Sequence, residues 1–149
     1  MNKHPDRTRK QVKWLAYAGL LPFIGLAILL WLVDSELHPF VALALAGYAA
    51  AIVSFLGGIH WGIGFRNASR MHNAPFFHFA WGVAPSLMAW VAISMPAYAG
   101  LPLLAVILGI CYAVDRKTYV VAGIQEWLPM RLHLTVVAAL SCLIGAAAT

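Results

Sequence analysis

Apolar residues run along this chain in long stretches, and most polar residues fall between those stretches. A helix needs about 20 consecutive apolar residues to cross the hydrocarbon core of a bilayer. Five stretches meet that need, at residues 12–33, 39–65, 76–95, 98–115 and 131–148. Because only short connections remain, the pattern predicts an all-α, polytopic membrane helix bundle forming a single transmembrane domain over residues 1–149.

Two prolines interrupt these stretches, Pro22 in the first and Pro85 in the third. Proline leaves the carbonyl four residues earlier without its donor, so we expect both helices to kink. The segment 118–128 is too short and too polar to cross the membrane. We expect it to lie along the cytoplasmic face and to be broken near Gly123.

The composition supports a membrane protein and excludes a soluble domain. The chain is 62% hydrophobic and 10% charged, whereas soluble domains carry roughly 45–50% apolar and about 25% charged residues. Such a chain has too few polar side chains to cover its surface in water. The bilayer is therefore its first expected partner.

The net charge of +5 comes from basic residues confined to alternate connections. They occupy the N-terminal tail and the second and fourth connections, as Lys3, Arg7, Arg9, Lys10, Lys13, Arg66, Arg70, Arg116, Lys117 and Arg131. Basic connections stay on the cytoplasmic side, so the pattern predicts a cytoplasmic N-terminus and a periplasmic C-terminus. The same placement suits anionic lipid heads, and we expect no nucleic-acid partner.

Small residues recur every seven positions along the second stretch, at Ala50, Gly57 and Gly64. On a helix they share one narrow stripe, and small residues at such spacing let two membrane helices approach closely. The large side chains of His60 and Trp61 flank the stripe. We expect the stripe to pack against another helix, with the third stretch as the nearest candidate.

Titratable groups gather at one end of the expected bundle. His60 lies five residues from the end of its stretch, roughly 7–8 Å along a helix. His78, Asp115 and His133 lie near the same end of three other stretches. Ionisable residues within a membrane usually face the protein interior and mark a polar partner or pathway.

A ligand pocket in the inner leaflet is one interpretation of this gathering, with two tryptophans that each adjoin a glycine as its walls. Its residues would be His60, Trp61, His78, Trp81, Asp115 and His133. The other interpretation is structural: His60 is a hydrogen-bonded core histidine, and Asp115 pairs with the adjacent Arg116 or Lys117. The sequence leaves both open, and it offers no metal-ligand cluster.

Several motifs resemble an uncharacterised family of five-span membrane proteins found in bacteria, with a mitochondrial relative. They are GLLPF at 19–23, SFLGGIHWG at 54–62, WGVAPSLMAW at 81–90 and Asp115 at the end of the fourth stretch. The resemblance covers nearly the whole chain. It implies a multi-pass protein of the bacterial inner membrane, and it implies no activity or catalytic residue.

Three classes of function fit these features. A non-enzymatic accessory subunit or assembly factor is favoured, because the chain has only five acidic residues and no nucleophile beside a base. Its partners would be other membrane proteins or further copies of the chain. The alternatives are a binder of a quinone, haem or lipid head group near His60, and a proton or small-solute pathway; the cofactor stays open.

Overall fold

The computed structural model describes residues 4–70 and 76–149, and these form helices and short turns only. Lys3, one of the basic residues counted above, lies outside this part of the chain. The helices are α1 (His4–Ala18), α2 (Leu21–Leu32), α3 (His38–Arg70), α4 (Phe76–Ile93), α5 (Ala97–Val121) and α6 (Leu128–Ala146). A short 3-10 turn, η1 (Gln125–Trp127), precedes α6.

The described residues contain five helical segments long and apolar enough to cross a membrane. They are Arg7–Leu32, His38–Ser69, Phe76–Ile93, Ala97–Val121 and Gln125–Ala146. The all-α bundle of five spans is therefore confirmed. Helices α3 and α5 continue past the predicted ends at residues 65 and 115, to Arg70 and Val121.

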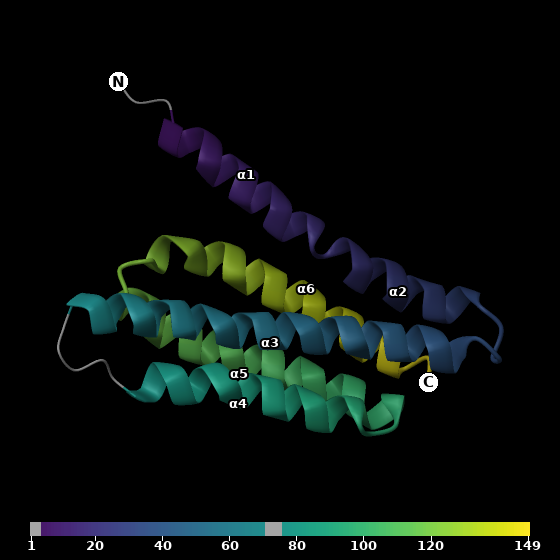
Figure 1. Ribbon diagram of the computed structural model, residues 1–149. Helices are drawn as coiled ribbons and strands as arrows, with labels where there is room; N and C mark the ends of the chain where they lie inside the picture. Colours follow the sequence, from purple (N-terminus) through teal and green to yellow (C-terminus); the bar gives the residue numbers. More distant parts are fainter. Residues whose placement is uncertain (1–3, 71–75) are drawn as a thin grey trace.

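The first span is made of α1 and α2, which meet at a break after Ala18 (Figure 1). Pro22 lies in the first turn of α2, as proline can at a helix start. The carbonyl of Gly19 at this break accepts a hydrogen bond of 2.8 Å from the Tyr48 hydroxyl of α3. Where a kink was expected at Pro22, the structure has a break between Ala18 and Leu21. Helix α4 runs continuously through Pro85, and a kink there stays a prediction.

Helices α3 and α4 approach each other closely at their glycines. A Cβ atom at Gly57 would collide with the backbone carbonyl of Gly82, and one at Gly64 would press on the Phe79 ring. Ala50, the third residue of the small stripe, is buried. The backbones can meet at Gly57 only because neither helix carries a side chain there.

Helix α5 ends where a glycine is needed. Gly123 has φ of +72°, a left-handed conformation that glycine adopts without steric cost. The amide of Ile124 donates to the Tyr119 carbonyl at 2.9 Å, and the amide of Gly123 donates to the Val120 carbonyl at 3.2 Å. These two bonds form a Schellman motif, so the break expected near Gly123 is confirmed.

The start of α1, the end of α3 and the turn before α6 lie at the same end of the bundle (Figure 1). The basic residues of the described chain gather there. Placement of that end in the cytoplasm stays a prediction of the charge pattern.

Candidate binding site

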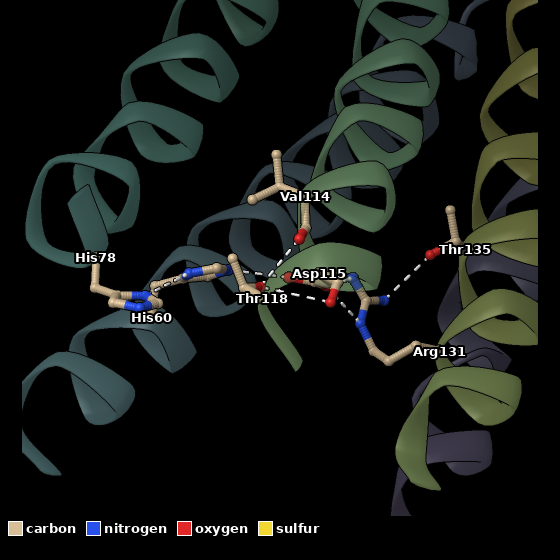
Figure 2. A network of polar contacts seen from close by, with 7 residues as sticks. All are labelled: His60, His78, Val114, Asp115, Thr118, Arg131 and Thr135. Carbon is tan, nitrogen blue, oxygen red and sulfur yellow. Dashed lines mark hydrogen bonds and ion pairs between the residues drawn. The ribbon is translucent and has the colours of Figure 1, made fainter. Parts of the chain in front are cut away.

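A chain of buried polar side chains crosses the bundle from α4 to α6 (Figure 2). His78 Nδ1 lies 3.3 Å from His60 Nδ1, and His60 Nε2 lies 3.0 Å from Oδ1 of Asp115. The other carboxylate oxygen accepts two hydrogen bonds from Arg131, from Nε at 3.0 Å and from Nη2 at 2.6 Å. Arg131 Nη1 then donates to the Thr135 hydroxyl at 3.1 Å. We call these five residues the polar network.

Burial sets the energetics of the network, since none of its residues is more than 8% exposed. An unpaired charge inside a membrane bundle would be strongly unfavourable. Asp115 and Arg131 avoid this by pairing through two charge-assisted hydrogen bonds on one oxygen, which are stronger than neutral ones. Thr135 lies one helical turn after Arg131 and so reaches the same guanidinium.

Hydrogen-bond roles follow from the carboxylate, which can only accept. Nε2 of His60 therefore carries a hydrogen and donates to Asp115. Between the two Nδ1 atoms, one nitrogen donates and the other accepts, because each carries either a hydrogen or a lone pair. Both ring nitrogens of His60 are thus engaged within the protein, and neither is free to ligate a haem iron.

Four of the six residues proposed as a pocket lie together. His60, His78 and Asp115 make the contacts above, and the Trp81 ring stands edge-on to His60 with centroids 6.4 Å apart. Figure 2 shows the chain of contacts running from helix to helix, not along the helices. It therefore joins the spans at one level of the bundle.

The other two residues make their contacts elsewhere. Trp61 is 39% exposed, and its indole N–H donates to the Phe79 carbonyl at 3.0 Å. His133 Nδ1 lies 3.2 Å from the Tyr17 hydroxyl, at an exposed contact between α6 and α1. Although His133 lies between the buried Arg131 and Thr135 in sequence, its side chain points toward α1.

The ion-pair partner of Asp115 is Arg131, which the charge pattern had indicated only as a basic residue of the cytoplasmic side. The cation that pairs with Asp115 thus lies sixteen residues later, and is not the adjacent Arg116 or Lys117. Arg131 and Thr135 were both missed as candidates. The available signal was their spacing of four at the start of the last stretch, which places both on one helix face.

A cavity of about 510 Å³ lies beside the network, between α1, α2, α3, α5 and α6. Its walls are apolar except for Tyr119, Trp127, Arg131 and Thr135, and Arg131 is the one charged residue among the described residues that line it. Two other lining residues, Leu15 and Phe55, are 67% and 66% exposed, so they mark its opening toward the surrounding lipid. The six residues proposed as a pocket do not line this cavity.

These features define a multi-pass membrane protein with a hydrogen-bonded polar network in its interior and a largely apolar cavity beside it. The chain belongs to the family described as protein of unknown function (DUF3429), whose model matches residues 8–147. The resemblance drawn from the sequence motifs is thereby confirmed.

Two curated relatives share the name Transmembrane protein 69. The protein of Xenopus tropicalis is 33% identical over 89% of this chain and 52% of its own length. The protein of Mus musculus is 26% identical over 89% of this chain and 54% of its own length. The chain thus spans about half the length of these relatives. No solved structure matches it.

Proposed function

We propose that this protein binds a lipid-like small molecule, with one apolar tail and one polar end, inside its helix bundle. The observation that carries the proposal is the cavity beside the polar network, whose walls are apolar except for Tyr119, Trp127, Arg131 and Thr135. Its volume of about 510 Å³ falls within the range of roughly 300–1,000 Å³ typical of ligand pockets. Apolar walls suit the tail, and the guanidinium suits a head group that accepts hydrogen bonds.

Arg131 has one N–H donor left for such a head group. A guanidinium carries five N–H groups, and the contacts to Asp115 and Thr135 use three of them. A fourth interacts with the Tyr119 hydroxyl, and the fifth belongs to a side chain that lines the cavity. A buried donor gains from a partner, so a bound head group would complete the hydrogen bonding of Arg131.

Entry from the bilayer is supported by the loose attachment of α1. Figure 1 shows α1 diverging from the rest of the bundle. Two side-chain contacts join α1 to η1 and α6: an exposed ion pair of Arg9 with Glu126 and the contact of Tyr17 with His133. Exposed ion pairs contribute only about 0–1 kcal/mol, so the Arg9–Glu126 pair adds little to the attachment of α1.

The test is to purify the protein from native membranes, extract it with organic solvent and identify bound small molecules by mass spectrometry. Ala16→Phe places a ring in the cavity from the loosely packed α1, and Ala51→Phe places the same ring on the exposed face of α3. We expect a molecule at near one per chain in the parent and in Ala51→Phe, and its loss from Ala16→Phe. Equal amounts of bound molecule in all three proteins, or none in the parent, would refute the proposal.

The functions considered from the sequence differ in how well they agree with ligand binding. An accessory subunit or assembly factor stays a prediction, and it is compatible with ligand binding. The transmembrane proton pathway has less support, because the network runs across the bundle at one level (Figure 2). For location we propose the bacterial inner membrane, supported by the basic residues at one end of the bundle.

A further inference from the structure

The two histidines of the network form a pair that can accept one proton without a change of side-chain conformation. In the neutral pair, His78 Nδ1–H donates to His60 Nδ1, which lies 3.3 Å away. A proton that arrives at Nε2 of His78 lets the shared proton shift onto His60, and His78 is then neutral again. The positive charge now sits on the imidazole that faces Asp115 at 3.0 Å.

Charge balance decides when such a proton is held. With both histidines neutral, Asp115 compensates Arg131, and the network carries no net charge. A proton alone would leave one positive charge buried, and an anion at Arg131 alone would leave one negative charge. Each is unfavourable in a medium of low dielectric constant, whereas the two together cancel.

We propose that the cavity binds an amphiphile with an anionic head group, and that the His60–His78 pair takes up one proton as it binds. This inference rests on the proposed function and names its ligand class. The head group interacts with the remaining donor and the positive charge of Arg131, and the pair restores neutrality on the far side of Asp115. Because linkage is reciprocal, the anion binds more tightly as pH falls, and the pair protonates more readily once the anion is bound.

The other titratable and charged groups around the pair are few in the described chain. Helix α4 contributes His78 itself, and α6 contributes Arg131. Helix α5 contributes Asp115 with Cys111 and Tyr119 near it; thiols and phenols are uncharged near neutral pH. Arg66, on the same helix as His60, donates instead to the Ala122 carbonyl at 2.8 Å.

The experiment uses the full chain in nanodiscs of zwitterionic lipid and two probes with the same tail. Hexadecyl sulfonate stays ionised at every pH used, so any proton uptake belongs to the protein, and hexadecanol has no charge. Kd is measured between about pH 5 and 8, the range in which histidine charge changes. We expect sulfonate binding to weaken by up to about tenfold per unit of rising pH, as one linked proton requires, and hexadecanol binding to stay constant.

Three variants assign the proton. The double variant His60→Gln/His78→Gln should bind the sulfonate with little dependence on pH, because the amides can hydrogen-bond but take up no proton. His133→Gln removes a histidine that contacts Tyr17 instead, and it should keep the full slope. If the double variant fails to fold, calorimetry of the parent in buffers of different ionisation enthalpy counts the protons directly, and one per sulfonate is expected.

The outcomes separate this inference from the proposed function. Sulfonate binding that does not vary with pH, or a slope that survives in the double variant, overturns the proton uptake and leaves the cavity as a binding site. Binding of hexadecanol alone overturns the anionic head group. If neither probe binds and no native molecule is extracted, both proposals fail.

Discussion

Asparagine at position 115 is the sharpest test of the polar network. Asp115→Asn keeps the shape of the side chain but removes its charge, and Arg131 is then left buried without a counter-ion. A guanidinium cannot lose its proton in a protein, so the charge has no means of disappearing. The amide also turns one of its own donors toward Arg131 or His60, both of which now donate to the carboxylate.

The expected cost is about 3–5 kcal/mol of unfolding free energy, the range for removing one partner of a buried ion pair. Arg131→Gln should cost less than Asp115→Asn, because the carboxylate that remains can be neutralised by a proton or by a charged His60. The double variant Asp115→Leu/Arg131→Met should recover much of the loss, since replacing a buried pair by apolar residues is often neutral or stabilising.

The assay is reversible unfolding in mixed micelles with increasing mole fraction of dodecyl sulfate. The matched control is Arg9→Gln, which breaks the exposed pair with Glu126, where both side chains are 50% exposed; it should cost about 0–1 kcal/mol. An Asp115→Asn protein that unfolds like Arg9→Gln would refute the reasoning, because it would mean that water already solvates the pair.

Two further predictions concern the contacts that shape the bundle. Gly57→Ala should cost about 1–3 kcal/mol of unfolding free energy in the same assay, because its Cβ meets the Gly82 carbonyl. Gly58→Ala, where nothing lies within 4 Å of the new atom, should stay within about 0.5 kcal/mol of the parent, and equal effects of the two would contradict the close helix contact. Tyr48→Phe should cost about 1–3 kcal/mol by leaving the Gly19 carbonyl unpaired; an unchanged midpoint would show that water or lipid replaces the hydroxyl.

The architecture could be predicted because a membrane reduces it to length and hydropathy. Each span needs a continuous apolar run, and a proline inside a run indicates where the helix can bend or break, as just before Pro22. Helix ends were less well predicted. Helix α5 continues to Val121 past three charged residues, because its end is set by the left-handed turn at Gly123 and not by the loss of apolar side chains.

The depth of a residue was predictable, whereas its direction around the helix was not. His60, His78 and Asp115 were expected at one end of the bundle, and they meet there. Trp61 and His133 share that end but contact other neighbours. Position along a helix follows from counting residues, but the side to which a residue points depends on how each helix is rotated against its neighbours. A helix that is apolar all around gives little information about that rotation.

The inward role of Arg131 was not predicted for another physical reason. Arginine at the start of an apolar run is normally explained by topology, since it anchors the helix at the cytoplasmic face. Here the same guanidinium is only 6% exposed and bonded to Asp115, so it neutralises a charge inside the bundle as well. The two roles are compatible because a long arginine side chain can begin near the interface and reach inward along its helix. When a carboxylate lies within a span, its counter-ion should therefore be sought among all the arginines at that end of the bundle. In this chain the hydroxyl of Thr135, four residues after Arg131 on the same helix face, was the signal that Arg131 turns inward.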